Sequence, residues 1–316
     1  MEKSGLTSLI RKKATMLGFD ACGFAQAEPV SEMVVNDYRH WIQNGFNGEM
    51  RYMENNMDKR FNPQLLMDNC KTVAVFAINH YTVKHFSESA PRVAKFAYGV
   101  DYHDLVRNKL RTLLNLLAED GIHLKGRAFC DSAPILERYW AVKAGLGWIG
   151  KNQNLIIPGK GSFFFLGILL LDTTLEYDQP MKNRCGRCER CLRACPTRAL
   201  NKQTLDANKC LSYLTIEKKG DFSSAEHKRM QQSNWIFGCD ICQEACPWNR
   251  FSTVQTAEIF EPISPFESWS MQDWQLLDET HFNETFKNSC LFRTTYAGIQ
   301  RNLKSVQTPK KNNTSI

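Results

Sequence analysis

The stretch RCGRCERCLRACPTRAL, residues 184–200, sets the interpretation of the whole chain. It places Cys185, Cys188, Cys191 and Cys195 at spacings of three, three and four, with a proline directly after the last cysteine. Bacterial ferredoxins use this spacing: three thiolates hold one 4Fe-4S cluster and the fourth reaches a second cluster. Two separate C-x2-C pairs would favour zinc, and the continuous series argues against that alternative. The stretch therefore predicts a two-cluster iron–sulfur region.

A second stretch, FGCDICQEACPWNR at 237–250, is a looser copy of the first. It again has a proline after its last cysteine but lacks a third closely spaced one, and Cys210 in KCLSYLTIEKKG is the natural substitute. This gives each cluster four thiolates and uses eight cysteines. The predicted ligand sets are Cys185, Cys188, Cys191 and Cys246 for one 4Fe-4S cluster, and Cys195, Cys210, Cys239 and Cys242 for the other.

The composition and the positions of the cysteines limit which class of protein this chain can be. A chain of 316 residues with 43% hydrophobic and 23% charged residues can bury a sizeable core. Residues 1–20 have the pattern of an amphipathic helix and not of a secretory signal, and the longest apolar run, 163–171, is too short to span a bilayer. We therefore expect a cytoplasmic protein without a membrane segment, in which clusters and not disulfides account for the crowded cysteines. The remaining cysteines, typical of small buried apolar residues, are Cys22, Cys70, Cys130 and Cys290.

The residues before the cysteines alternate between strand and helix patterns. Short apolar runs predict strands, and stretches with helical periodicity that end at a glycine predict helices. Together they indicate a mixed α and β structure. A helix that begins after Asp131 or Ser132 would use one of them as its N-cap. The predicted elements are a strand at 71–81, a helix at 99–121, a strand at 124–131, a helix ending at Gly145, and a hairpin at 154–171 with its turn at 158–161.

A change of composition at 178–182 divides the chain. We predict an α+β domain at 1–175, a two-cluster ferredoxin-like domain at 176–252 and a helical C-terminal segment at 253–316. The first part has no G-x-G-x-x-G after a strand, so a Rossmann dinucleotide site is not indicated. The glycine-rich stretch GLGWIGKN at 145–152 either wraps a flat or phosphate-bearing cofactor or is a structural turn.

Several motifs together resemble the epoxyqueuosine reductase family over residues 1–250. They are DYH from Asp101, CDSAPILER from Cys130, GLGWIGKN, the ferredoxin run, CLSYLTIE from Cys210 and CDICQEACPWN from Cys239. The resemblance implies an enzyme that uses cobalamin and two 4Fe-4S clusters to reduce epoxyqueuosine to queuosine at the wobble position of tRNA, the last step of queuosine biosynthesis. It also implies a nitroreductase-like cobalamin-binding domain, followed by the ferredoxin-like domain. An external low-potential donor such as a flavodoxin or ferredoxin would supply electrons to a monomer.

By resemblance, Asp131 is the proton donor to the departing epoxide oxygen. Removing that oxygen as water takes two electrons and two protons, so an acid is needed beside the reduced cofactor. Asp131 would then have to be protonated near neutral pH, in a desolvated pocket. The alternative is that Asp131 only caps the helix that follows it.

The resemblance also implies residues around the corrin. His103 lies in DYHDLVRN, where Val106 replaces the glycine of the cobalamin motif D-x-H-x-x-G. We therefore expect His103 to line the pocket or cap a helix, and the cobalt to lack a protein histidine. The predicted cobalamin contacts are Arg60, Tyr98, Tyr102, His103, Asp131, Lys151 and Asn152.

The net charge of +7 is compatible with a tRNA partner or with an ordinary solvated surface. Basic stretches at 182–190, 217–220 and 226–230 would supply phosphate contacts. Longer family members carry a helical-repeat extension, whose tRNA contacts we expect to be absent or replaced here. Residues 266–289 have helical spacing and should pack on the core, ahead of the polar tail KKNNTSI.

Two other functions remain open from the sequence. A reductive dehalogenase uses the same cofactors, although we would expect a twin-arginine export signal, which this N-terminus lacks. A non-catalytic two-cluster electron-transfer protein would have no use for Asp131 or the glycine-rich stretch.

Overall fold

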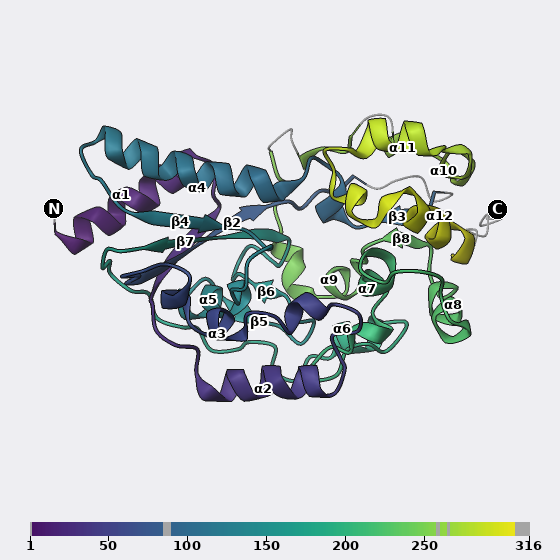
Figure 1. Cartoon of the computed structure of the whole chain (residues 1–316), viewed down its shortest axis with the longest axis horizontal. Helices are drawn as coiled ribbons and strands as arrows, with labels where there is room; N and C mark the ends of the chain where they lie inside the picture. Colours follow the sequence, from purple (N-terminus) through teal and green to yellow (C-terminus); the bar gives the residue numbers. More distant parts are fainter. Residues whose placement is uncertain (1, 85–89, 257–259, 264–265, 307–316) are drawn as a thin grey trace.

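A four-stranded antiparallel sheet organises the first half of the chain (Figure 1). The computed structural model describes residues 2–84, 90–256, 260–263 and 266–306. The antiparallel sheet with separate helical layers agrees with the predicted α+β class. In spatial order the strands are β1 (Ala21–Gln26), β2 (Thr72–Asn79), β7 (Phe164–Leu171) and β4 (Gly126–Phe129).

Helices cover both faces of this sheet. Alternate residues of the fully buried strand β2 point to opposite faces, so Val75 joins one core and Phe76 the other. The Phe76 face packs against α1 (Lys3–Met16) and α4 (Tyr102–Glu119). The Val75 face packs against α2 (Glu32–Gln43), α3 (Met57–Phe61) and α5 (Glu137–Lys143). Figure 1 shows the resulting three layers.

Helix α4 follows the predicted pattern closely. Leu110, Leu113 and Leu117 are buried on one face against the sheet. The carboxylate of Asp101 caps the helix by accepting a hydrogen bond from the backbone N–H of His103. Gly121, with φ of 80°, follows its last turn. The first helical turn, which carries Tyr102 and His103, is therefore fixed at the end of a well-packed helix.

Two predicted elements are wrong. Neither Asp131 nor Ser132 caps α5, which begins only at Glu137 with Leu136 in the N-cap position. The predicted hairpin at 154–171 does not form, because β6 (Leu155–Ile156) pairs with β5 (Trp148–Ile149) and β7 pairs with β2 and β4. The turn itself exists, since Ile157 and Gly161 form an isolated antiparallel bridge.

Short helices follow in the cysteine-rich part. Strand β3 (Arg92–Val93) pairs in parallel with β8 (Trp235–Phe237) and so ties this part to residues that precede α4. The cation of Arg92 also lies over the Trp235 ring, 4.6 Å from its centroid. The helices are α6 (Arg190–Ala194), α7 (Leu211–Ile216), α8 (Ser224–Met230) and α9 (Ile241–Glu244).

The C-terminal segment is helical, as predicted. It contains α10 (Met271–Leu276), α11 (Glu279–Phe286) and α12 (Thr295–Ser305). Trp274 and Phe286 stack with their ring centroids 5.7 Å apart and are buried in a separate apolar cluster. The polar tail KKNNTSI lies outside the described residues. Within the described part, no helix is both long and apolar enough to cross a membrane.

Two residues of α12 clamp this segment to the cysteine-rich part. The buried Asn302 amide donates to the carbonyls of Thr215 and Ile236, both at 2.8 Å. Arg301 donates to carbonyls at the end of α7 and in the loop after it, and its guanidinium lies over the Phe222 ring. The segments that the clamp holds, α7 and β8, directly flank Cys210 and Cys239.

Candidate functional site: two cysteine pockets and a carboxylate

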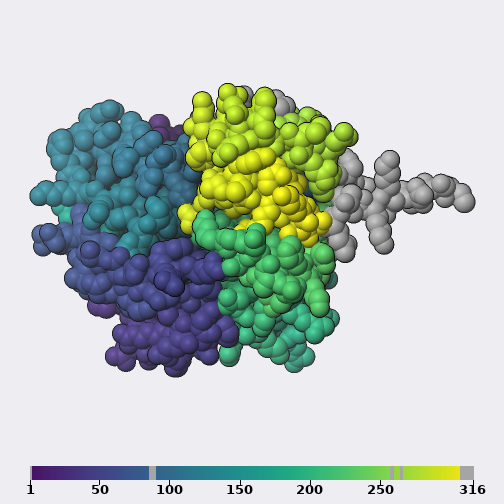
Figure 2. Space-filling view, turned by 45° about the vertical axis from the view of Figure 1, so that its right-hand side comes forward, coloured from purple at the N-terminus to yellow at the C-terminus, as the bar shows by residue number. Residues whose placement is uncertain are grey.

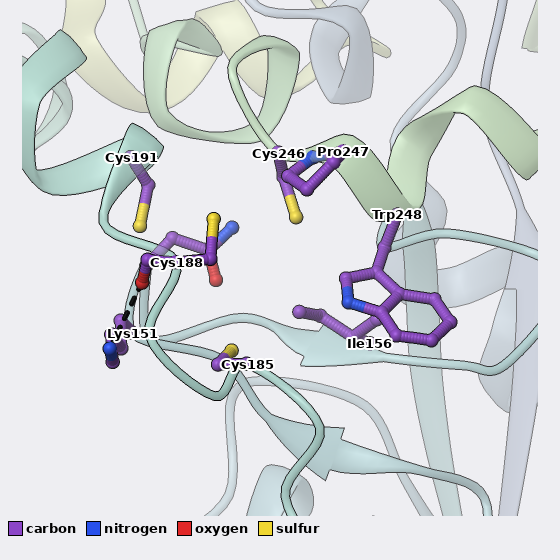
Figure 3. Close-up of a pocket in the computed structure, with 9 residues that line it drawn as sticks. Lys151, Ile156, Cys185, Cys188, Cys191, Cys246, Pro247 and Trp248 are labelled. Carbon is purple, nitrogen blue, oxygen red and sulfur yellow. Dashed lines mark hydrogen bonds between the residues drawn. The ribbon is translucent and has the colours of Figure 1, made fainter.

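Four cysteines line the first pocket. Figure 3 shows Cys185, Cys188, Cys191 and Cys246 around one space, with Trp248 and Ile156 on its far wall. Lys151 fixes the loop from one side, because its ammonium donates to the carbonyls of Gly186 and Cys188 at 2.9 Å. The cysteines that share this space are those predicted for one cluster.

The other four cysteines line a larger cavity. Cys195, Cys210, Cys239 and Cys242 form one wall of it. They are the set predicted for the other cluster, and the two sets meet at α6, which begins just before Cys191 and ends just before Cys195. The first half of the chain also contributes lining residues, which are Phe96, Arg138, Asn152, Gln153 and Asn154. This cavity therefore brings four thiols together with polar and aromatic groups from the first half of the chain.

Asp131 lies next to this cavity, in the loop between β4 and α5. Its carboxylate accepts a hydrogen bond from the Tyr102 hydroxyl at 2.8 Å and lies 3.2 Å from Nε2 of His103. The ring of Tyr102 is 6.5 Å from that of Phe96, which lines the cavity. At the other end of the loop, Arg138 also lines the cavity and donates to the carbonyl of Gln153.

Helix α5 holds the backbone of the Asp131 loop. Asp131 has φ of 56°, a left-handed conformation that costs a non-glycine residue on the order of 1 kcal/mol. Its N–H donates to Oε1 of Glu137 at 2.6 Å, in the first turn of α5. Burial raises the pKa of Glu137 to about 8, with the charge of Asp131 acting in the same direction. Glu137 therefore anchors the strained residue.

His103 holds a proton between two carboxylates. Burial alone would lower its pKa, but hydrogen bonds to Asp101, Asp131 and Cys290 raise the pKa to about 11. For Asp131, burial raises the pKa, yet the hydrogen bonds from His103 and Tyr102 outweigh it and hold the pKa below its ordinary value. The pair is thus a protonated imidazole beside a carboxylate at neutral pH.

The protonated, desolvated Asp131 that the acid role requires stays a prediction. In this structure its side chain is 60% exposed, and it is ionised because its neighbours donate to it. A charge-assisted network surrounds the carboxylate. A proton is available in the network, but it resides on His103.

The structure distributes the other predicted cobalamin contacts over several places. Tyr102 and His103 surround Asp131, and both ring nitrogens of His103 already face carboxylates, so neither points at a free metal position. Asn152 lines both pockets, whereas Lys151 lines only the first. Buried Arg60 donates to the Tyr52 carbonyl, and buried Tyr98 packs in the C-terminal apolar cluster.

Sequence reasoning missed several charged residues at the site. Arg293 donates to both carboxylate oxygens of Glu217, at 3.0 and 3.1 Å, and its charge helps to lower the pKa of Asp131. Glu137 and Arg138 close the motif CDSAPILER, but neither was expected to act at the site. No motif of the sequence analysis contains Arg293.

Two family models match this chain. One, described as "Epoxyqueuosine reductase QueG, DUF1730", matches residues 60–132, and a 4Fe-4S double cluster binding domain matches residues 184–249. The epoxyqueuosine reductase of Cyclobacterium marinum is 44% identical over 305 residues, which cover 95% of this chain and 96% of that protein. The chain belongs to the epoxyqueuosine reductase family. That of Cellulophaga algicola is 40% identical, over 94% of this chain and 96% of the relative.

Solved structures of this family share the fold. A crystal structure of an epoxyqueuosine reductase with an epoxyqueuosine-modified tRNA-Tyr stem loop has a TM-score of 0.85 and 26% identity, over 95% of this chain and 80% of that chain. The Bacillus subtilis epoxyqueuosine reductase, with the loop of its catalytic aspartate swung out of the active site, has a TM-score of 0.83 at 26% identity, over the same shares. Family membership makes this chain an oxidoreductase and confirms the predicted resemblance, the fold class and the pair of 4Fe-4S clusters.

Proposed function

We propose that this chain reduces epoxyqueuosine in tRNA to queuosine with cobalamin and two 4Fe-4S clusters, and that Asp131 delivers a proton to the departing oxygen. The observation that carries the proposal is that Asp131 binds the Tyr102 hydroxyl, and the Tyr102 ring lies 6.5 Å from that of Phe96, which lines one cavity together with four cysteines. An acid thus lies close to the site of an electron source. The family relationship and the tRNA stem loop bound to a solved relative support the choice of substrate.

The cysteines supply the iron ligands in this proposal. The thiols of Cys185, Cys188, Cys191 and Cys246 hold one cluster, and those of Cys195, Cys210, Cys239 and Cys242 hold the other. Because the second set lines the larger cavity, electrons leave the protein's iron–sulfur region there. Each ligand set takes cysteines from both cysteine stretches, so neither cluster site is complete until both stretches have folded together.

The larger cavity fits a flat, amide-rich cofactor. The amide nitrogen of Asn152 is buried without a hydrogen-bond partner among the described residues, and Asn154 and Arg138 add further polar groups. A corrin ring carries amide side chains that accept and donate hydrogen bonds, which satisfies such groups. When bound, cobalamin supplies a low-potential metal centre that transfers electrons to carbon. Asn152, Arg138 and Tyr102 are the residues that we expect to hold it.

The proton path starts at His103. A nucleoside that covers Asp131 would remove water from its exposed carboxylate and raise its pKa, because burial disfavours the charged form. The proton on Nε2 of His103, 3.2 Å away, would then pass to Asp131 and on to the epoxide oxygen. Asp101, on the other side of the ring, stabilises the imidazolium before transfer. Two electrons and two protons together remove the oxygen as water.

The test is a direct conversion assay. Anaerobically reconstituted protein, cobalamin and dithionite are incubated with epoxyqueuosine-containing tRNA, and the nucleosides are analysed by mass spectrometry. We expect a product lighter by one oxygen atom, which does not form if cobalamin is omitted. Unchanged epoxyqueuosine, with both clusters and cobalamin demonstrably bound, would refute the proposal.

Three further features belong to the proposal. An external low-potential flavodoxin or ferredoxin supplies the electrons, the protein acts as a monomer, and it works in the cytoplasm, where its tRNA substrate is found. Light scattering of the reconstituted protein tests the oligomeric state, and a mass of twice 36.3 kDa would contradict it.

A further inference from the structure

We propose that the basic surface around the first cysteine pocket is the docking site of an acidic electron-donor protein. This inference rests on the proposed function, because it assumes that the pocket holds a 4Fe-4S cluster. It adds a partner surface and assigns the arginines between the cysteines to protein recognition instead of tRNA recognition. The residues of this surface, the basic collar, are Lys182, Arg184, Arg187, Arg190, Arg193 and Arg198.

The basic collar is exposed and electrically unbalanced. All six side chains are exposed, and residues 182–198 contain a single acid, Glu189, which pairs with Lys202 at 3.1 Å. Among the described residues, none of the six cations forms a salt bridge or a side-chain hydrogen bond. By contrast, Lys218 in another basic stretch is paired with Glu49. The collar therefore presents a concentrated positive charge that no acid balances within the described part of the chain.

Hydrogen bonds to the backbone fix the loop that carries these cations. Lys151 donates to the carbonyls of Gly186 and Cys188, and Figure 3 shows it beside Cys188. The backbone is thus fixed by contacts that do not use the collar side chains. A preorganised loop with free cations suits a transient partner, because little ordering is needed when the partner arrives.

An apolar contact lies beside the same pocket. Trp248 lines the pocket, and its ring is 6.0 Å from that of Phe251, which is 39% exposed. Arg250 lies over the Phe251 ring, 4.5 Å from the centroid. An apolar spot next to a buried redox centre, with cations close by, is the form of a small, short-lived electron-transfer interface.

The direction of electron flow favours a protein over tRNA at this surface. The second cysteine set lines the cavity beside Asp131, so the modified base has to reach that cavity. The first set lines the smaller pocket, whose lining includes neither Asp131 nor its partners Tyr102 and His103. Electrons therefore enter at the first pocket, and an acidic donor is attracted to the collar by charge complementarity.

The redox balance requires two such encounters for each turnover. An acidic flavodoxin in its hydroquinone form gives one electron to the oxidised first cluster and leaves as the semiquinone. A second hydroquinone repeats the step. The two electrons, with two protons, convert the epoxide to an alkene and water, so each donor must dissociate quickly.

Charge reversal tests the docking surface. The variant Arg184→Glu/Arg187→Glu/Arg193→Glu is compared with the wild type, using a reduced acidic bacterial flavodoxin as probe. Stopped-flow spectroscopy follows cluster absorbance at several salt concentrations. We expect the second-order rate of cluster reduction to fall at least about tenfold at low salt, and its salt dependence to reverse or vanish. A variant with glutamine at the same positions should show a smaller fall.

A matched control carries the same change in charge elsewhere. Lys3, Lys12 and Arg111 are exposed on α1 and α4, and their replacement by glutamate should leave the flavodoxin reaction unchanged. Iron content and the electron paramagnetic resonance spectrum verify that every variant holds both clusters. Equal rates of flavodoxin reduction in the wild type and the collar variant would overturn the proposal.

Dithionite separates this inference from its alternatives. The small reductant needs no docking surface, so turnover with dithionite should be the same in the wild type and the collar variant. If the collar instead binds tRNA, the variant will raise the KM for tRNA with dithionite as donor, and the inference fails. If the proposed function itself is wrong, the wild type will not convert epoxyqueuosine with dithionite, while flavodoxin will still reduce its clusters.

Discussion

The cysteine pockets and the Asp131 loop are built in different ways. The first pocket takes three of its four thiols from one short stretch and the second takes two, and in both pockets the ligand atoms are chemically identical. Asp131 depends on hydrogen bonds from α4 and α5, and it has a left-handed backbone. Loss of one thiolate should cost the whole cluster. By contrast, loss of one hydrogen bond around Asp131 leaves the other hydrogen bonds in place. Mutations in the two regions should therefore give all-or-none and graded losses, respectively.

The largest effect is expected from Cys210→Ser. Removing the fourth thiolate of the second set should cost that cluster, so the reconstituted protein should hold half the iron of the wild type and show no turnover. Iron analysis and electron paramagnetic resonance measure the loss. Cys22→Ser on β1, outside both pockets, is the control and should keep all the iron. Two intact clusters in the Cys210 variant would show that Cys210 is not a cluster ligand.

Asp131→Asn should slow conversion by about 10²–10⁴-fold, the range for loss of a general acid. Asparagine can still accept from Tyr102, but it cannot pass on a proton. Single-turnover rates with dithionite provide the measurement, and cobalamin absorbance and iron content should match the wild type. A rate close to that of the wild type would mean that Asp131 is not the proton donor and has only a structural role.

His103→Gln should lower the single-turnover rate by about 10–100-fold and also change the pH dependence of stability. Since the folded pKa of His103 is about 11, its stabilisation is complete below the ordinary histidine pKa near 6.5 and is lost as the pH rises toward 11. The wild type should therefore lose up to about 1.4 kcal/mol of unfolding free energy per pH unit through this group. Thermal unfolding at pH 7 and 9 should show a smaller loss in the variant. Equal losses would mean that His103 is neutral in the folded protein.

The smallest effect concerns the anchor of the Asp131 loop. Glu137→Ala removes the acceptor at 2.6 Å from the Asp131 N–H and should reduce turnover about tenfold, because a hydrogen bond of this kind contributes about 1–2 kcal/mol. Glu137→Gln keeps an acceptor oxygen and should retain most of the activity. The swung-out loop of the Bacillus subtilis relative shows that such a loop can leave the site in that enzyme. Similar rates for both variants would exclude an anchoring role.

Local patterns were sufficient for part of this molecule. Strand β2 and helix α4 are strongly periodic, and the spacing of the cysteines alone indicated which thiols would share a pocket. The start of α5 was wrong because the side chain of Asp131 turns away to Tyr102 and His103, a contact between distant segments that its own neighbours do not encode. The hairpin was wrong because β7 occupies an inner position in the sheet, with a partner on each side.

The protonation states of the site residues could not be predicted from the residue types either. The acid role predicts a protonated Asp131 in a desolvated pocket, and the sequence did not indicate that a cationic His103 lies beside it. Glu137 and Arg138 close the motif CDSAPILER, yet the motif does not show what they contact, and the contact of Arg293 with Glu217 joins segments that are far apart in the sequence. Such residues become visible only when the tertiary structure is known.

The clamp of α12 has a consequence for the timing of maturation. Arg301 and Asn302 fasten the segments that flank Cys210 and Cys239, and both follow every cysteine of the second set in the chain. Until α12 has been made and has packed, the second cysteine set is therefore held only loosely. Iron and sulfide then have to be delivered after α12 has docked, and the apo form must persist long enough to meet the machinery that loads it.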